Sequence, residues 1–387
     1  MTSQPPPRFE VVARFVAALP RTSLPALGDP ALHPRTARAL AGEFARGWSR
    51  RHLARMAQTL DPLTEPMGKV AVIAPGNLFV AAWQAVLEPW LAGNHVRVRP
   101  SQRDGGAVGW LIGQLARHGG MALPEVVSLD RAAPHQWPQF FAAEALAVWG
   151  DDTTVAAVQA LATRHGFTGQ LRDHGQRQAL AVVDVASLTS PQLQRVMAGL
   201  ARDALHGDGR GCLSLGSVVW LGVPGADQQA VHDRFASELD RQRTRLPVAR
   251  RGNTDAPFVQ HLDSQKETMS ILATIRADVC WTPRADGWLV SAPLAALAGA
   301  WPGLGQRGVS AAFADGDLAL AAALQPLAQR TSGLAIAGSP ALRTQVLAAI
   351  GSCYPCRPGA LQRPPCFRST DGWPALAAYR RPLGLGD

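Results

Sequence analysis

The sequence predicts an α/β protein in which two doubly wound α/β domains follow an N-terminal helical cap. Apolar strands alternate with amphipathic helices between positions 68 and 164, and a second alternation runs from 179 to 242. Parallel sheets that carry helices on both faces produce such an alternation. The 387 residues are also enough for two hydrophobic cores.

The N-terminal part, over about 8–60, is expected to be helical. Four prolines, at positions 20, 25, 30 and 34, divide it into short helices. It carries Trp48 and an arginine-rich face and is expected to pack as a helical cap.

A βαβ unit follows the cap. It consists of a strand, a helix and a second strand, over 68–75, 78–91 and 95–99. Gly93-Asn94 ends the helix, because both residues tolerate the left-handed conformation found there. The strands present Asn77 and Arg99 at their carboxyl ends, where parallel sheets bind ligands. The unit contains no GxGxxG pattern, so an ordinary dinucleotide fingerprint is absent.

Further elements continue the alternation. They are a helix, two strands and a helix, over about 105–118, 125–129, 145–149 and 154–164. An aspartate or threonine within Gly150-Asp151-Asp152-Thr153 is expected to cap the last helix. The glycine-containing stretch 166–178 is expected to cross into the second domain. That domain begins with a strand, a helix, a strand and a helix, over 179–184, 190–205, 217–222 and 227–242.

The remainder of the chain is less regular. Residues 245–335 show no clear pattern. The closing stretch from 351 is rich in proline, cysteine and arginine and is expected to be an ordered loop.

The net charge of +9 does not indicate a nucleic-acid-binding protein. Of the 38 basic residues only Lys69 and Lys266 are lysine, a bias typical of a GC-rich genome, and basic runs do not exceed triplets. No RNP, zinc-finger or helix-turn-helix signature is present. A basic surface would still attract anionic partners such as phosphorylated coenzymes or an acidic acyl carrier protein.

Composition predicts a cytoplasmic protein without a membrane span. Hydrophobic residues make up 47% of the chain, but no apolar run reaches membrane length. The first ten residues lack the charged and then apolar design of a signal peptide. Five unevenly spaced cysteines do not indicate a disulfide framework, which favours a reducing compartment.

Cys212 is the strongest candidate for a reactive side chain. It stands in the run Gly207-Asp208-Gly209-Arg210-Gly211-Cys212, between a predicted helix and a predicted strand. Glycines allow close approach of the backbone to a reacting atom. Nearby backbone N–H groups lower the pKa of a thiol and can hold an oxyanion. The alternative is a small buried residue in a turn.

Several motifs occur in one order between about 68 and 375. They are Gly76-Asn77, Ala92-Gly93-Asn94 with Arg99-Pro100-Ser101, Val148-Trp149-Gly150-Asp151, Gly211-Cys212-Leu213-Ser214, and a tail of Pro358-Gly359-Ala360-Leu361-Gln362, Pro365 and Asp371-Gly372-Trp373. With these motifs the chain resembles the aldehyde dehydrogenase superfamily, and most closely its acyl-CoA reductase branch, the LuxC-type family.

The resemblance implies an aldehyde-dehydrogenase-like fold and a specific reaction. The reaction is NADPH-dependent reduction of an acyl thioester, carried by CoA or by an acyl-carrier protein, to the aldehyde through an acyl-cysteine on Cys212. The Cys212 backbone N–H and the Asn77 side chain would stabilise the oxyanion, with a turn residue after a strand as the alternative for Asn77. The expected organisation is a helical segment over 1–66, a dinucleotide-binding domain over 67–177 that 345–387 rejoins, and a catalytic domain over 178–344. A homo-oligomer is compatible with the resemblance, because the superfamily commonly forms dimers and tetramers.

The resemblance also assigns a coenzyme site. Arg99 stands where aldehyde dehydrogenases usually carry a lysine, and a planar guanidinium suits a 2′-phosphate. This favours NADPH over NADH, although a strand-end arginine can be merely solvated. Ser101 and Arg103 would assist. Pro75 and Gly150 complete the expected cofactor site, with a simple strand-ending turn as the alternative for Gly150.

One departure from the superfamily bears on the reaction. The Glu-Leu-Gly-Gly element, whose glutamate activates water in hydrolytic members, corresponds to Arg172-Asp173-His174-Gly175-Gln176. Without that base, an acyl-enzyme suits exchange with a thiol better than hydrolysis. His174 and His206 are candidate acids or bases, with a surface-loop histidine as the alternative for each.

The C-terminal cysteines do not predict a metal site. Cys353, Cys356 and Cys366 provide three ligands without a nearby histidine, whereas zinc sites use four. Prolines 355, 358 and 364 surround the CxxC pattern and disfavour the strand-to-helix turn of a redox motif.

A second function remains open at this point. A non-catalytic member of the same family that binds acyl-CoA or a carrier protein as an interaction module would also explain arginine at 99 and the altered stretch 172–176.

Overall fold

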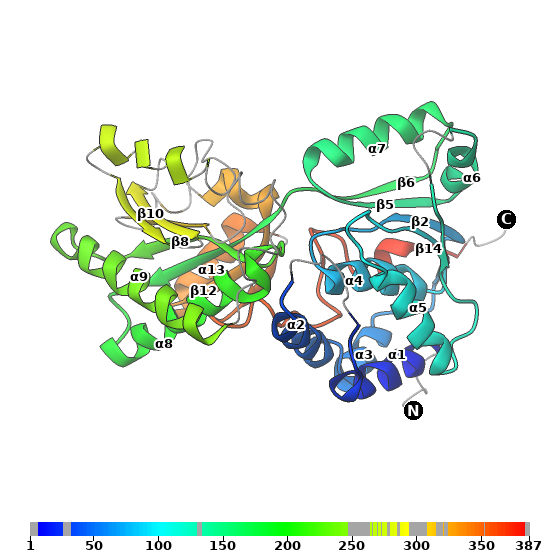
Figure 1. The fold of residues 1–387 in the computed structure, drawn as a ribbon, viewed down its shortest axis with the longest axis horizontal. Helices are drawn as coiled ribbons and strands as arrows, with labels where there is room; N and C mark the ends of the chain where they lie inside the picture. The colour runs from blue at the N-terminus through cyan, green and yellow to red at the C-terminus, as the bar shows by residue number, and fades with distance from the viewer. Residues whose placement is uncertain are drawn as a thin grey trace. The chain divides into compact units, whose positions relative to one another are not determined.

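The computed structural model describes residues 7–25, 32–129, 134–246, 264, 266–268, 270–271, 273–276, 279–284, 287–293, 308–314, 320, 324–351 and 353–383 (Figure 1). The chain forms two compact units. The first comprises Met1–Pro30, Ala37–Gln176 and Arg363–Asp387, and the second comprises Ala31–Thr36 and Arg177–Gln362.

A five-stranded parallel sheet is the centre of the first unit. Its order is β4-β3-β2-β5-β6, and its strands are β2 Lys69–Ile73, β3 His95–Arg99, β4 Glu125–Val126, β5 Ala145–Trp149 and β6 Gln170–His174. Every side chain of β5 is buried, as expected for a central strand covered on both faces. The strand expected over 125–129 is shorter than predicted.

Helices cover both faces of this sheet. Figure 1 shows α7, Asp152–Arg164, on one face, and α4, Phe79–Leu91, with α5, Ala107–Arg117, on the other. Asp151 caps α7, because its carboxylate accepts a hydrogen bond of 2.6 Å from the backbone N–H of Thr154. The expected doubly wound arrangement and the expected acidic cap are both present.

The described part of the N-terminal segment forms the helices α1 Pro7–Ala18, α2 Pro34–Gly47 and α3 Arg50–Ala57. Aromatic side chains of α1 and α2 pack on α4. The rings of Phe15 and Phe44 lie edge-on to Trp83, with centroids 5.7 and 5.4 Å away. A short strand, β1 Thr64–Pro66, then pairs antiparallel with β14 Arg380–Pro382 at the other end of the chain.

The stretch 166–178 is not a crossing loop as expected. Residues 170–174 form β6, which pairs in parallel with β5 as the fifth strand of the first sheet. The prediction failed because Gln170-Leu-Arg-Asp-His lacks an apolar run: an edge strand has only one neighbour and tolerates polar side chains. The crossing takes place only after Gln176.

The second unit is built on a seven-stranded sheet. Its order is β13-β12-β7-β8-β11-β10-β9, and its strands are β7 Gln178–Asp184, β8 Leu215–Leu221, β9 Cys280–Arg284, β10 Gly287–Pro293, β11 Gly308–Ala314, β12 Thr331–Ala337 and β13 Tyr354–Cys356. Among the strands that the structure describes in this sheet, β9 alone runs antiparallel to its neighbour.

Two hydrophobic clusters fill the two faces of the second sheet. Along β7, Ala181 and Val183 belong to the cluster with Met197 of α8, Ser190–Leu205, and Phe235 of α9, Gln228–Arg245. Leu180 and Val182 belong to the other, with Val346 and Ile350 of α13, Pro340–Ile350. The alternation follows from the two-residue period of a strand. This unit is therefore also covered by helices on both faces.

The chain returns to the first unit later than the expected position 345. Helix α13 packs on the second sheet, and β13 pairs in parallel with β12. The return begins at Arg363. The closing stretch is mostly irregular, as expected, but it contains β13 and β14.

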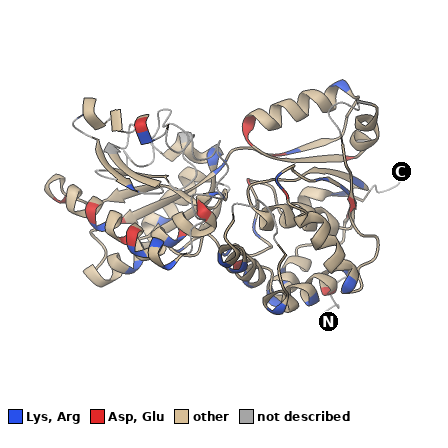
Figure 2. Ribbon diagram, viewed as in Figure 1, with Lys and Arg blue, Asp and Glu red and all other residues tan. Residues whose placement is uncertain are grey.

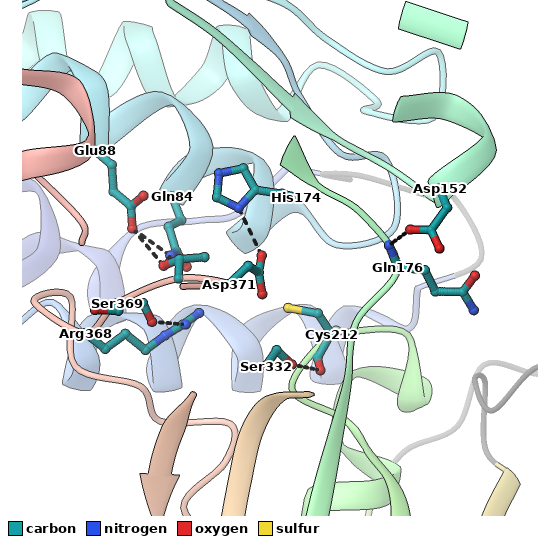
Figure 3. Close-up of polar contacts among 11 residues, drawn as sticks. Gln84, Glu88, Asp152, His174, Gln176, Cys212, Ser332, Arg368, Ser369 and Asp371 are labelled. Carbon is teal, nitrogen blue, oxygen red and sulfur yellow. Dashed lines mark hydrogen bonds and ion pairs between the residues drawn. The ribbon is translucent and has the colours of Figure 1, made fainter. Parts of the chain in front are cut away.

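A buried carboxyl group joins α4 to the returning chain. Glu88 is 1% exposed and accepts hydrogen bonds from Gln84 Nε2 at 2.7 Å and Thr370 Oγ1 at 3.4 Å (Figure 3). Burial raises the pKa of Glu88 from 4.5 to about 7, against the opposing effect of these hydrogen bonds and of Arg368. The folded chain thus holds a proton that the unfolded chain releases above pH 4.5.

Replacing Glu88 by glutamine tests how protonation of this carboxyl group affects stability. The contribution of the retained proton to the free energy of unfolding is fully present below about pH 4.5 and is lost as the pH rises through about 7. Glu88→Gln should therefore gain stability relative to the unmodified protein as the pH rises, by up to about 3 kcal/mol at pH 8. Urea unfolding at pH 5 and pH 8 measures the gain. The exposed Glu125→Gln is the control, and an equal gain at both pH values would contradict the prediction.

No helix among the described residues has both the length and the apolar character needed to span a bilayer.

Candidate functional site

The carboxyl edge of the first sheet gathers most of the predicted site residues. Asn77 follows β2, Arg99 ends β3, Gly150 follows β5 and His174 ends β6. Because all five strands are parallel, these four residues lie at one edge. The chain order reverses between β2 and β5, and such switch points bind ligands in open α/β sheets.

The turn after β2 approaches the turn after β3 closely. A side chain at Gly76 would collide with the Oγ of Ser101 and lie 2.7 Å from its Cβ, so only glycine fits. The Ser101 hydroxyl accepts a hydrogen bond of 3.2 Å from the backbone N–H of Arg103, whose side chain is exposed. Pro75 is buried at the end of β2 and shapes this turn without offering a donor.

Arg99 is half-buried beside an aromatic ring. Its guanidinium carbon lies 5.8 Å from the centroid of Trp137, in α6 Trp137–Phe141. The ends of β2 and β3 therefore bring together the guanidinium of Arg99, the hydroxyl of Ser101 and Gly76, where no side chain fits. This set of groups fits a phosphorylated dinucleotide.

Asn77 and Gly150 also take part in local turns. The side-chain oxygen of Asn77 accepts a hydrogen bond of 2.9 Å from the N–H of Leu78, just before α4. Its amide nitrogen is the group that could donate to an oxyanion. A side chain at Gly150 would lie 2.8 Å from a methyl carbon of Thr154, so the start of α7 requires this glycine.

His174 is buried and paired with a carboxylate, which excludes a surface-loop role. Its Nδ1 lies 2.9 Å from Oδ2 of Asp371, and the two side chains are 2% and 3% exposed (Figure 3). Its ring stacks on the ring of Trp149, and the two ring centroids lie 3.9 Å apart. With Nδ1–H donated to Asp371, Nε2 is the acceptor of the neutral ring, and it has no hydrogen-bond partner in the described structure.

A tight turn presents Asp371 to His174. Asp371 and Gly372 have φ angles of +53° and +87°, and Thr370 and Trp373 exchange backbone hydrogen bonds of 2.8 and 2.9 Å around them. Both φ values are typical of a type I′ turn, for which Asp-Gly is a preferred sequence. The sequence contained this turn signal, but nothing in it indicated that the aspartate meets His174.

Cys212 lies in the second unit, on the turn between α8 and β8. Gly207, Asp208 and Gly209 have φ angles between 60° and 68°, a conformation that glycine adopts without strain. Cys212 itself is half-buried on this turn. The turn lies at the amino ends of β7 and β8, since Ala179 N–H donates to the carbonyl of Ser214.

His206 is buried at the end of α8 and is not a surface histidine. It is 6% exposed and closes the helix through its backbone N–H, which donates to the carbonyl of Arg202. This places His206 at the base of the cysteine turn.

The C-terminal cysteines are divided between the units. Cys353 and Cys356 belong to the second unit and Cys366 to the first. Burial raises the pKa of Cys353 to about 11 and those of Cys356 and Cys366 further. These thiols are therefore protonated and poorly nucleophilic near neutral pH.

The fold has many relatives of known structure. Three examples are methylmalonate-semialdehyde dehydrogenase from Oceanimonas doudoroffii (TM-score 0.65, 16% identity, 98% of this chain and 85% of that chain), an NAD-dependent aldehyde dehydrogenase from Sinorhizobium meliloti (0.66, 16%, 98% and 82%), and aldehyde dehydrogenase 21 from Physcomitrella patens in complex with the reaction product succinate (0.68, 12%, 98% and 86%). At these identities the likeness establishes the aldehyde dehydrogenase fold.

Sequence comparison establishes the family. No curated protein sequence matches the chain. The family model described as acyl-CoA reductase (LuxC) matches residues 60–380, which is most of the chain. Both the cysteine turn and the strand-end residues of the first sheet lie within the matched range. The chain therefore belongs to the LuxC family of acyl-CoA reductases.

Proposed function

We propose that the protein reduces an acyl thioester, a fatty acyl-CoA or an acyl-carrier protein, to the aldehyde with NADPH. Membership of the family supports an aldehyde-related oxidoreductase. The observation that carries the thioester reaction is Cys212, half-buried on a glycine-rich turn, in a chain whose 172–176 stretch lacks a glutamate.

Cys212 is the nucleophile in this reaction. Its thiolate attacks the thioester carbonyl carbon, a new C–S bond forms, and the carrier thiolate leaves, so that the acyl group rests on Cys212. The Cys212 backbone N–H and the Asn77 amide stabilise the oxyanion. Bound NADPH supplies hydride for reduction of the acyl carbon. The resulting thiohemiacetal oxyanion collapses to release the aldehyde and return the Cys212 thiolate.

Proton transfer falls to His174. Overall the reaction consumes one proton, which the departing carrier thiolate takes up. The imidazole donates its Nδ1–H to Asp371, so that Nε2 is the atom that takes and gives the proton. Residues 172–176 contain no glutamate that could activate water. The acyl-enzyme is therefore preserved from hydrolysis for reduction or for return to a thiol.

The experiment that tests the function has two stages. The protein is incubated with acyl-CoA esters of increasing chain length without coenzyme, and peptide mass spectrometry locates any acyl group, which should be on Cys212. NADPH is then added, and its oxidation is followed together with trapping of the aldehyde. Binding of acyl-CoA and acyl-carrier substrates without acylation or turnover would instead support the non-catalytic binding module.

Arg99 is expected to select NADPH over NADH. Replacing it by glutamine removes the charge that faces a 2′-phosphate, so the KM for NADPH should rise about tenfold to hundredfold, and the KM for NADH less than about threefold. Steady-state kinetics with both coenzymes measure the difference. Arg97→Gln is the matched control, because Arg97 lies on the same strand and pairs with Glu125. Equal effects on both coenzymes would contradict this role.

A further inference from the structure

The three peptide units nearest Cys212 are each held at the carbonyl oxygen. The Gly211 carbonyl accepts a hydrogen bond of 2.9 Å from the N–H of Ser214. The Cys212 carbonyl accepts one of 2.5 Å from the hydroxyl of Ser332 (Figure 3). The Leu213 carbonyl accepts one of 2.9 Å from Nε2 of Gln362.

These contacts set the direction of the N–H groups, because a peptide unit is planar. The carbonyl of Gly211 and the N–H of Cys212 belong to the same plane, and so do the carbonyl of Cys212 and the N–H of Leu213. The Ser214 hydroxyl also accepts a hydrogen bond of 3.1 Å from the N–H of Gly211. The turn is therefore held on both sides of the peptide unit whose N–H is the proposed oxyanion donor.

Gln362 is itself positioned by a buried carboxylate. Asp203, in the last turn of α8, is 1% exposed and accepts a hydrogen bond of 2.6 Å from the N–H of Gly359. It also accepts hydrogen bonds from the N–H groups of Leu361 and Gln362. Nε2 of Gln362 in turn donates to the backbone carbonyl of Asp203 at 3.2 Å. The loop that carries Gln362 is thus fixed to the helix that precedes the cysteine turn.

We infer that Ser332 and Gln362 are positioning residues that hold the peptide units around Cys212 in the orientation needed to stabilise the oxyanion. Ser332 reaches the turn from the start of β12, 120 residues away, and Gln362 from the end of the second unit, 149 residues from Leu213. Neither side chain supplies a nucleophile or a proton. Their effect is to keep a donor in place, so that the turn does not reorganise when the carbonyl oxygen becomes negative.

The role of these residues depends on Cys212 acting as the nucleophile proposed above. The test compares Ser332→Ala and Gln362→Met with two control variants. Thr331→Val removes a neighbouring buried hydroxyl, which donates to the Leu327 carbonyl at 2.7 Å. Gln192→Met removes a side chain that caps α8. Both controls lose a comparable hydrogen bond without touching the cysteine turn.

Three readouts are made on the full-length protein. They are hydrogen exchange of a peptide covering 206–214, the rate of Cys212 alkylation by iodoacetamide, and the rate of acyl transfer from an acyl-CoA ester. Ser332→Ala and Gln362→Met should speed exchange in the turn and slow acyl transfer about tenfold to hundredfold. The KM for the ester should change less than about threefold, because a displaced oxyanion donor acts on the transition state. The two controls should change none of the readouts.

The outcomes separate the positioning role from the proposed function. Unchanged acyl transfer in Ser332→Ala and Gln362→Met overturns the positioning role, whether or not exchange increases. Equal losses in Thr331→Val and Gln192→Met also overturn it, because the effect is then one of general stability. If the unmodified protein transfers no acyl group, the proposed function fails, whereas exchange and alkylation still report whether these side chains hold the turn. If Ser332→Ala does not fold, the half-buried Gln362 still permits the test.

Discussion

Replacing Cys212 by alanine is expected to abolish acylation and to lower NADPH-dependent aldehyde formation by at least about 10³-fold. The alanine variant lacks the atom that forms the new C–S bond, and no other group in the proposed mechanism can accept the acyl group. Folding should be unaffected, because the side chain is half-buried and the contacts that hold the turn are made to its backbone carbonyl groups, which the substitution keeps. Peptide mass spectrometry and coenzyme oxidation measure the two losses.

Cys280→Ala is the matched control for this variant. Cys280, at the start of β9, is also half-buried, but burial raises the pKa of its thiol. It should therefore be a poor nucleophile, and its removal should leave activity unchanged. Acyl transfer that persists in Cys212→Ala and is lost in Cys280→Ala would identify Cys280 as the acceptor and refute the proposed role of Cys212.

Replacing His174 by alanine is expected to slow turnover by about 10² to 10⁴-fold, the usual contribution of a positioned acid or base. Asp371→Asn should cause a smaller loss, because the histidine remains but its ring is no longer oriented by a carboxylate. Added imidazole should partly restore His174→Ala, since the vacated space between Trp149 and Asp371 fits the missing ring. Rates measured with and without imidazole give the comparison.

His165→Ala controls for the loss of a packed imidazole in the same unit. Its ring stacks on Phe141 with centroids 6.2 Å apart, and it belongs to no carboxylate pair among the described residues. This variant should retain full activity. A loss in His174→Ala that imidazole does not restore, together with an equal loss in His165→Ala, would show that His174 is only structural.

Local sequence patterns were sufficient for most of the regular structure. The helix predicted over 190–205 has those boundaries, and those over 78–91 and 227–242 agree with α4 and α9 to within a few residues. The spacing of apolar residues and the residue types that begin and end a helix are properties of a single element. They can therefore be recognised in one stretch of sequence. Strand β6 escaped prediction because its position at a sheet edge, and not its own pattern, makes it a strand.

The candidate site likewise combines residues that the sequence reveals with partners that only the fold brings near. Cys212, Asn77 and Arg99 are visible in the sequence because each stands in a recognisable turn or at a strand end. The partners of the site are not visible there. Asp371 lies 197 residues from His174, and Ser332 and Gln362 reach the cysteine turn from similarly distant parts of the chain.

By itself, the sequence determined the α/β class and most element positions, and it supplied the candidates for covalent and coenzyme chemistry. Residue types and short-range spacing carry this information. Only the tertiary structure decided that His174 is a buried acid–base candidate rather than a surface histidine, and that donors from distant segments hold carbonyl groups of the cysteine turn. These properties arise from strand order and from the return of the chain at Arg363, which bring distant segments within hydrogen-bonding distance and remove them from water.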